Sequence, residues 1–321
     1  MISPQPAHKE QTSMGTVMSH NAFGMYAEDC LDAVCREVAR LESILSRNIP
    51  ESDVSRINQN AGRNFVEVNP ETFNILARSF ELSAICDGDF DITIAPLVNL
   101  WNIGKNTFTQ PPSREIKQVL ELVNYRDLIL DASSKKVGLS RPRQAIDLGG
   151  IGKGYTGDCI LEIFRDFGVT SAYSNLGGNV VTLGAKPDGT PWNIGIQHPR
   201  LVDSLLGSLA VIDRSIVTSG SYQRFSNDSL GKQFHHIIDP ATGYPVESGL
   251  VSVTIVSDNS MTADVLSTAL FVMGINRGME LLISFPKTEA ILMDSEEKVF
   301  VSKGLKGLFQ SNKNILYTIL E

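Results

Sequence analysis

Apolar residues recur at three- and four-residue steps in two segments near the start of the chain, residues 27–45 and residues 71–86. This spacing is typical of amphipathic helices, which bury one face against another element. We therefore predict a helix over each segment. The polar stretch between them, residues 46–62, contains Pro50 and several Ser and Asn residues and is predicted to be a loop.

The middle of the chain carries mixed signals. Residues 88–104 are apolar but interrupted by Pro96 and by Asp and Asn, so they alternate between strand-like and loop-like patterns and are expected to face a ligand. Residues 113–123 have a helical pattern. Residues 128–139 resemble two short strands around a turn at 133–136.

From Gln144 onward the pattern is denser: a strand, a glycine-rich turn, a helix over 153–167 ended by Gly168, a strand over 171–175 and a second turn at Gly177 and Gly178. Further strands are expected between 192 and 256, and a last helix from Thr262. Strands outnumber helices, and short turns join many neighbours. The predicted fold class is therefore α+β, with a mainly antiparallel sheet flanked by helices.

Residues 1–12 are polar and are predicted to be a flexible N-terminal arm, followed by a short strand over 13–20. Residues 13–321 are predicted to form one domain. The 42% of hydrophobic and 20% of charged residues are close to globular usage, which argues against disorder.

Charge and targeting signals narrow the class of protein. The formal net charge of −8 gives no overall positive field for a polyanionic backbone, so nucleic-acid binding is not expected. No apolar run approaches the roughly 18 residues of a membrane span, and no signal peptide is visible. We expect a cytoplasmic protein, or an extracytoplasmic one if a leader was removed. Neither a zinc site nor a disulfide scaffold is indicated by the spacing of the four cysteines, Cys30, Cys35, Cys86 and Cys159.

The sharpest chemical signal is the glycine-rich turn of residues 147–155, which reads Asp-Leu-Gly-Gly-Ile-Gly-Lys-Gly-Tyr. Glycines between a strand and a helix let backbone amides approach a phosphate, and Lys153 adds a positive charge. The turn matches neither a Walker A loop, which needs Gly at Asp147 and Ser or Thr at Gly154, nor a G-x-G-x-x-G motif. A glycine-rich connection without any ligand is the alternative.

Two oxygen-bearing side chains stand four residues apart at the start of the last predicted helix, Asp264 and Thr268. At this spacing they share one helix face. Together with a backbone carbonyl and waters they would suit Mg²⁺. The alternative is a structural role for both: Asp264 would interact favourably with the helix dipole, and Thr268 would donate a hydrogen bond to the carbonyl four residues earlier.

The third signal is residues 235–245, in which His235 and His236 precede Asp-Pro-Ala-Thr-Gly. The second part is good hairpin-turn chemistry. Adjacent strand residues face opposite sides, so at most one histidine enters a given site, where it could exchange a proton near neutral pH. A satisfied structural histidine is the alternative.

Taken together, these segments resemble the FAD:protein FMN transferases, the ApbE-like family. The resemblance extends over nearly the whole chain in five ordered blocks: residues 14–16, 88–101, 147–155, 235–245 and 263–270. It implies an α+β fold with a flavin-nucleotide cleft. It also implies an enzyme that uses Mg²⁺ to pass FMN from FAD to a Thr or Ser hydroxyl of an acceptor protein, releasing AMP. Family acceptors carry that hydroxyl in a short Asp- and Gly-containing motif.

The resemblance also implies roles for individual residues. Asp264 and Thr268 would bind Mg²⁺ together with the Gly150 carbonyl and the Ser267 hydroxyl. His236 would be the base, with Asp239 able to share that duty. The dinucleotide would be contacted by Asp147 and Lys153, in a pocket lined by Met14, Asp89, Phe90, Asp91 and Ile238.

One departure from the family pattern is Asn48, which stands where the family usually has Tyr and would contact the nucleotide. A smaller polar side chain would shield bound FAD less and admit water, so hydrolysis of FAD to FMN and AMP is an alternative activity. A flavin-binding protein without turnover is a further alternative. Such a protein would have no use for a Mg²⁺ site or a proton acceptor.

Overall fold

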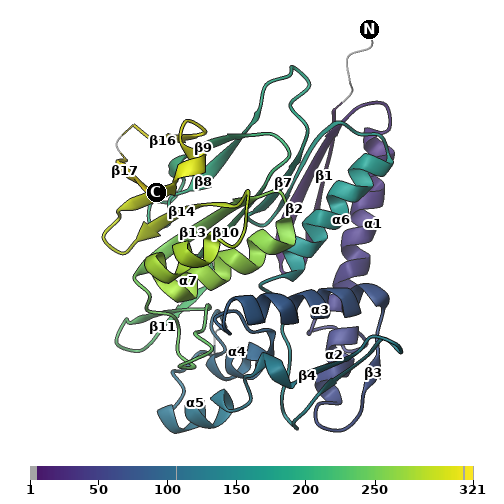
Figure 1. The fold of residues 1–321 in the computed structure, drawn as a ribbon, viewed down its shortest axis with the longest axis vertical. Coiled ribbons are helices and arrows are strands. Elements are labelled where there is room, and N and C mark those ends of the chain that lie inside the picture. The colour runs from purple at the N-terminus through teal and green to yellow at the C-terminus, as the bar shows by residue number, and fades with distance from the viewer. Residues whose placement is uncertain (1–5, 106, 314, 321) are drawn as a thin grey trace.

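The computed structural model describes residues 6–105, 107–313 and 315–320 and consists of a large sheet with helices on one side and a small sheet on the other (Figure 1). The large sheet has nine strands in the order β1-β2-β6-β7-β10-β13-β14-β15-β17. Every neighbouring pair is antiparallel except β15–β17. The expected α+β class with a mainly antiparallel sheet is confirmed. The strands are β1 Pro6–Ser13, β2 Thr16–Phe23, β6 Ser171–Leu176, β7 Asn179–Leu183, β10 Ser215–Gly220, β13 Leu250–Ser257, β14 Glu289–Asp294, β15 Val299–Ser302 and β17 Tyr317–Leu320.

Three long helices lie side by side on one face of this sheet: α1 Ala27–Leu45 on β1 and β2, α6 Gly152–Asp166 on β6 and β7, and α7 Ser260–Leu282 on β10 and β13. α6 contacts both of the others. Apolar side chains from helix and strand fill the space between these layers, for example Leu270 of α7 and Val253 of β13. Burial of this apolar area is the main stabilising contribution.

The opposite face of the large sheet is covered by a three-stranded sheet in the order β16-β9-β8. Its strands are β8 Trp192–Gln197, β9 Leu205–Val211 and β16 Phe309–Ser311. Ile196 and Leu209 of the small sheet share a core with Ile216 and Val256 of the large one.

The remaining elements form the lower part of the view in Figure 1. These elements are α2 Asp53–Gln59, α3 Pro70–Ile85, α4 Ala95–Trp101, α5 Ser113–Leu120, β3 Val66–Glu67, β4 Leu128–Asp131, β5 Lys136–Leu139, β11 Phe225–Asn227, β12 Gln233–His235 and the short 3₁₀ turns η1 Ile92–Ile94 and η2 Tyr125–Asp127. A second apolar core holds α2, α3 and the sheet of β3, β4 and β5 against α7 through Val265 and Ala269, and a separate cluster that includes Trp101, Ile116 and Phe234 packs α4, α5 and β12 together. A third 3₁₀ turn, η3 Lys303–Leu305, follows β15 and joins the core between the large and small sheets.

Several sequence predictions are wrong in detail. Residues 6–12 of the expected flexible arm belong to β1, because eight residues pair with β2; residues 1–5 lie outside the described residues. The strand expected over 13–20 is broken by a turn at Met14 and Gly15, which both have positive φ. The expected loop 46–62 contains α2, whose start is capped by the Ser52 hydroxyl.

Two further differences lie closer to the glycine turn. Residues 95–101 of the mixed segment form α4, with Pro96 in the first turn, where proline is tolerated. The strand expected from Gln144 is not formed. Instead, the Asn58 side chain bonds to both the N–H and the C=O of Ile146, at 2.7 and 3.0 Å, in place of a neighbouring strand.

α7 meets the length and hydropathy criteria for a membrane-spanning helix, which the sequence inspection did not anticipate. In the fold it is a core helix that packs against the sheet and α6, and about half of its apolar window is buried. Its apolar character is therefore explained by its place between the two layers.

Candidate active site

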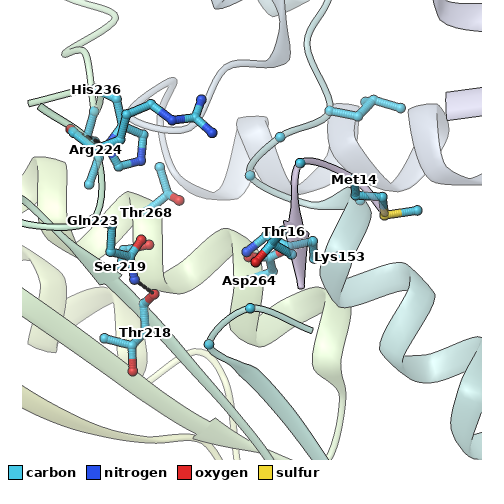
Figure 2. Close-up of a pocket in the computed structure, with 18 of the residues that line it drawn as sticks. Met14, Thr16, Lys153, Thr218, Ser219, Gln223, Arg224, His236, Asp264 and Thr268 are labelled. Atoms are coloured by element: carbon cyan, nitrogen blue, oxygen red, sulfur yellow. Dashed lines mark hydrogen bonds between the residues drawn. The ribbon is translucent and has the colours of Figure 1, made fainter. Parts of the chain in front are cut away.

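A cavity of about 980 Å³ lies where α6 and α7 begin, and it contains most of the residues expected to carry chemistry. This volume is at the upper end for ligand pockets and suits a dinucleotide. Figure 2 shows His236 and Arg224 on one side, Met14 and Lys153 on the other, and Asp264 and Thr268 between them. The predicted residues that line it are Met14, Asn48, Asp89, Phe90, Asp91, Asp147, Gly150, Lys153, His236, Ile238, Asp264 and Thr268.

The glycine turn and α7 are joined by a hydrogen bond. The backbone N–H of Gly154 donates to Oδ2 of Asp264 at 2.8 Å. This contact requires glycine, because a Cβ at position 154 would lie 2.5 Å from the Ser260 carbonyl oxygen and 2.7 Å from the Asp264 Cβ. The spacing of these residues in the sequence gives no indication of this close approach.

Asp158 of α6 strengthens the same junction. Its carboxylate accepts hydrogen bonds from the backbone N–H groups of Ser260 and Met261, at 2.8 and 2.9 Å, and from the Asn259 side chain. It therefore caps the start of α7 from the neighbouring helix. Burial raises the pKa of Asp158 to about 6, and its hydrogen-bond donors oppose that shift. Sequence inspection did not single out this residue, since a lone Asp on a helix carries no distinctive signal.

Three residues that could offer oxygen atoms to a cation, Gly150, Asp264 and Thr268, line the same cavity beside the turn. Gly150 is close to Thr268, since a Cβ built on the glycine would lie 3.4 Å from the Thr268 hydroxyl. Among the described residues Thr268 does not donate back to the Asp264 carbonyl, which was the structural alternative; Ser267 makes that bond instead, at 2.8 Å. Within the same ranges no cluster of three or more His, Cys, Asp or Glu side chains forms a metal site. A cation here would therefore depend on a hydroxyl and a carbonyl beside a single carboxylate.

Ser267 and Asp239 are not among the residues that line the cavity. The Ser267 hydroxyl also contacts Ser219, at 2.8 Å. The Asp239 carboxylate accepts from the Ala241 N–H and the Thr242 hydroxyl within the hairpin turn. Both side chains are thus engaged in local structure.

The backbone of Arg224 holds the His236 imidazole in one tautomer. Its Nδ1 lies 3.1 Å from the Arg224 carbonyl oxygen, which can only accept, so Nδ1 carries the proton and Nε2 keeps its lone pair. Burial lowers the pKa of His236 to about 4, and positive charges such as Arg224 and Lys153 add to this shift. The imidazole is neutral at pH 7. His235 faces away and contacts the Val246 carbonyl oxygen at 3.0 Å.

The predicted aspartates differ in how free their carboxylates are. Asp147 forms an ion pair with Arg47 at 2.9 Å and accepts from the Gly149 N–H. Asp89 pairs with Arg277 of α7 at 2.5 Å; burial raises the pKa of Asp89 and Arg277 opposes this. The first pair joins two residues of the cavity lining, and the second joins Asp89 of the lining to α7.

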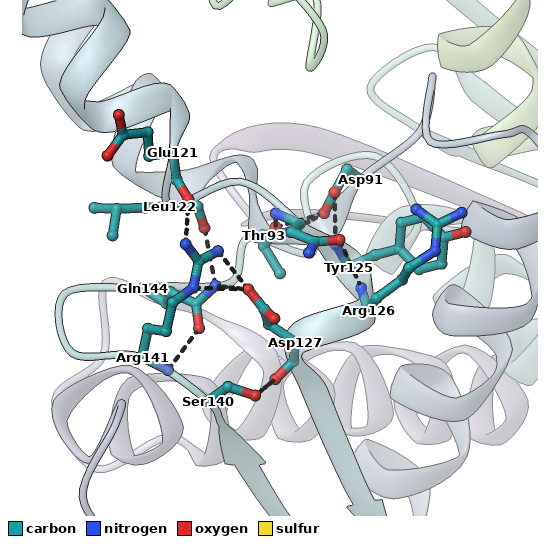
Figure 3. A network of polar contacts seen from close by, with 11 residues as sticks. Asp91, Thr93, Glu121, Leu122, Tyr125, Arg126, Asp127, Ser140, Arg141 and Gln144 are labelled. Atoms are coloured by element: carbon teal, nitrogen blue, oxygen red, sulfur yellow. Dashed lines mark hydrogen bonds and ion pairs between the residues drawn. The ribbon is translucent and has the colours of Figure 1, made fainter.

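Asp91 has a structural role within its own loop (Figure 3). Its carboxylate accepts from the N–H and hydroxyl of Thr93, at 2.7 and 2.6 Å, and from the Tyr125 N–H at 2.8 Å. Burial raises the pKa of Asp91, and these hydrogen bonds act against the shift. Asp127 anchors the next turn through Arg141 and Gln144. This network orders the loop that carries Phe90.

Two cationic side chains at the cavity were missed by the sequence inspection, Arg47 and Arg224. Both stand outside any recognisable motif, so tertiary structure alone brings them to the site. Lys153, which was predicted, donates to the Asn179 side chain at 3.0 Å. The lining thus carries these three cationic side chains beside five carboxylates, Glu42, Asp89, Asp91, Asp147 and Asp264, so groups that could bind an anion are local rather than a net positive charge of the cavity.

Comparison with known proteins identifies the family. A sequence profile described as the ApbE family matches residues 14–292. The chain belongs to the ApbE family. It is 36% identical to an FAD:protein FMN transferase of Klebsiella pneumoniae over 83% of this chain and 82% of that protein. It is also 32% identical to one of Treponema pallidum over 86% of this chain and 80% of that protein.

Solved structures agree with this ApbE assignment. The ApbE protein of Thermotoga maritima superposes with a TM-score of 0.88 at 28% identity, covering 96% of this chain and all of that one. The flavin transferase ApbE from Vibrio cholerae superposes with a TM-score of 0.85 at 25% identity, covering 95% and 99%. The resemblance expected from the sequence blocks is therefore confirmed.

Proposed function

We propose that this protein is an FAD:protein FMN transferase that moves FMN from FAD to a Thr or Ser hydroxyl of an acceptor protein and releases AMP. The observation that carries the proposal is the hydrogen bond from Gly154 to Asp264, because it joins the glycine turn to α7 beside a cavity of about 980 Å³. The names of the relatives support the same reaction. Lys153, Arg47 and Arg224 would bind the phosphates, and Met14, Phe90 and Ile238 would contact the flavin nucleotide.

The donor set of the cavity fits Mg²⁺. Asp264 supplies a carboxylate oxygen, Thr268 a hydroxyl and Gly150 a backbone carbonyl, which are the hard oxygen ligands that this ion prefers. When bound, Mg²⁺ would neutralise charge that develops on the phosphate oxygens. The Gly154 N–H would orient the Asp264 carboxylate for this purpose.

His236 is the proposed proton acceptor. As the acceptor hydroxyl attacks phosphorus, a new O–P bond forms, the bridging P–O bond breaks and AMP leaves. The hydroxyl proton passes to Nε2 of His236, which is unprotonated because Nδ1 faces the Arg224 carbonyl oxygen.

The test is to coexpress the protein with candidate acceptors and examine each by mass spectrometry. An FMN-sized adduct on a Thr or Ser, dependent on FAD and Mg²⁺, is the expected result. Binding of FAD without an adduct on any acceptor and without AMP release would instead indicate a flavin-binding protein.

Hydrolysis of FAD is a second candidate activity, favoured by the position of Asn48. This exposed side chain lines the cavity, and its backbone N–H is held by the Ser46 hydroxyl at 3.3 Å. A short amide there leaves the bound nucleotide open to water. AMP release in the absence of any acceptor measures this activity.

A further inference from the structure

Strand β8 forms part of the cavity wall and is at the same time an edge strand. The small sheet has the order β16-β9-β8, so only one side of β8 is paired. Four consecutive residues, 194–197, line the cavity. Because side chains alternate along a strand, a cavity that touched only one face would contact every second residue. The cavity therefore meets the edge of the strand.

Hydrogen bonds in the small sheet show which backbone groups lie on that edge. The Ala210 N–H donates to Leu308 at 3.2 Å, and the Asn312 N–H to Leu206 at 2.9 Å. The backbone N–H and C=O groups of even-numbered residues of β9 therefore bond to β16, and those of odd-numbered residues bond to β8. In the register, Leu209 lies opposite Ile194, so Ile194 bonds to β9. The residues on either side of Ile194 in β8 therefore direct their N–H and C=O groups to the unpaired edge.

These outward residues are Asn193, Gly195 and Gln197. Gln197 is included because the next residue, His198, donates its N–H to the Ser204 carbonyl oxygen at 2.9 Å, on the paired side of the strand. Backbone groups alternate in direction along a strand, so those of Gln197 lie on the unpaired side. All three residues are exposed, and no backbone or side-chain group of the described residues bonds to their N–H or C=O. At about 3.3 Å per residue they span roughly 13 Å, the length of a five-residue extended segment.

We propose that the outer edge of β8 docks an extended segment of the acceptor protein as an added strand. This inference rests on the proposed function, because it concerns the acceptor of that reaction. Main-chain hydrogen bonds to an exposed edge are a recurrent mode of peptide recognition. The edge opens into the cavity that holds Lys153, Asp264 and Thr268, so a hydroxyl on the added strand would be delivered to the phosphates.

A side chain beside the edge would support the added strand. Leu205 is 45% exposed and lies over Gly195, where a built Cβ would be 3.0 Å from the leucine Cδ1. An exposed apolar side chain there gives the docked segment a surface to cover. A second copy of this chain could pair with the same edge. The acceptor is the occupant we favour, because the edge is continuous with the reaction cavity.

The test uses two matched pairs of variants, Asn193→Pro with Asn193→Ala and Gly195→Pro with Gly195→Ala. Each proline removes one outward N–H, and each alanine has a similar Cβ and keeps the N–H. Proline on an unpaired edge is tolerated, so the ladder to β9 remains. The probe is a synthetic peptide of about ten residues with one Thr among Asp and Gly. Relative to its alanine partner, each proline variant is expected to raise KM for the peptide about 3- to 10-fold, the loss of one hydrogen bond, with kcat changed less than about 2-fold.

A second measurement does not depend on turnover. A peptide in which Val replaces Thr should slow hydrogen exchange at the amides of Asn193, Gly195 and Gln197 in the wild-type protein loaded with FAD. Equal KM values within each pair, or no protection of these amides by the peptide, would overturn the docking site. Protection that grows with protein concentration alone would assign the edge to a second copy and also overturn it. Protection by the Val peptide together with no FMN adduct on the Thr peptide would support docking while counting against the proposed reaction.

Discussion

The backbone N–H of Gly154 and the carboxylate of Asp264 meet across 2.8 Å, although 110 residues separate them in the chain. The first belongs to the glycine turn at the start of α6, and the second to α7. This contact aligns the two helix starts around the cavity. Its geometry depends on the absence of a side chain at position 154.

Replacement of Gly154 by alanine is expected to destabilise the protein by about 1–3 kcal/mol, because the new Cβ would overlap the Ser260 carbonyl and Asp264. Thermal unfolding measures this cost. The control is Gly152→Ala in the same helix, whose Cβ would meet only the Leu148 Cβ at 3.9 Å. Unfolding midpoints that fall equally in both variants would show that the close approach carries no special cost.

Asp264→Ala is expected to lower the rate of FMN transfer by at least about 100-fold and to abolish its dependence on Mg²⁺, since the proposed site has a single carboxylate. Ser267→Ala is the comparison, because this neighbouring hydroxyl bonds to the Asp264 carbonyl and Ser219 and lies off the cavity lining. We expect a less than tenfold change for Ser267→Ala. A loss as large as that of Asp264→Ala would make Ser267 a ligand.

His236→Gln is expected to slow transfer by about 100- to 10,000-fold, the usual contribution of a proton acceptor. The adjacent His235→Gln, which faces the Val246 carbonyl, should retain most activity. Only neutral His236 can accept a proton, and its pKa is about 4. The rate should therefore rise with pH up to about pH 5 and then be independent of this group. Identical effects of the two substitutions would contradict the assignment.

Asn48→Tyr is expected to lower AMP release in the absence of an acceptor, because a larger ring at the exposed edge of the cavity would exclude water from bound FAD. Asn48→Ala should leave this release unchanged or raise it. AMP can be quantified chromatographically after incubation with FAD and Mg²⁺. If the tyrosine variant releases AMP as fast as the wild type, position 48 does not control access of water.

Stability below neutral pH should depend on His20 of β2, which is fully buried and lies opposite Ser174 of the neighbouring strand β6. Its Nδ1 faces the Ser174 hydroxyl at 2.9 Å, and burial lowers the pKa of His20 to about 4. The unfolded chain binds more protons between pH 6.5 and 4, so the free energy of unfolding falls as pH falls through this range, by about 3 kcal/mol at pH 4. His20→Gln should remove this part of the acid sensitivity. The free energy of unfolding, measured with denaturant at pH 7 and pH 4, would reveal this difference. An equal loss of that free energy between the two pH values in the wild type and in His20→Gln would refute it.

Local patterns in the sequence were sufficient to predict many of the helices and the fold class. The helix over Ala27–Leu45 was predicted with its observed bounds, and α3, α5 and α6 to within a few residues at each end, because apolar periodicity reflects the face that each helix buries. α2 and α4 were missed. They are seven residues long, too short for a periodic stripe to stand out from loop composition.

Short motifs in the chain are sufficient to show which residue types could carry the chemistry and in which blocks they occur, since such motifs depend on local backbone conformation. How the blocks meet follows only from the folded domain. Arg47 and Arg224 reach the cavity, Asp239 and Ser267 turn to local partners, and β8 presents an unpaired edge. These outcomes depend on contacts between residues far apart in the chain, and side-chain packing and strand order establish such contacts only when the whole domain folds.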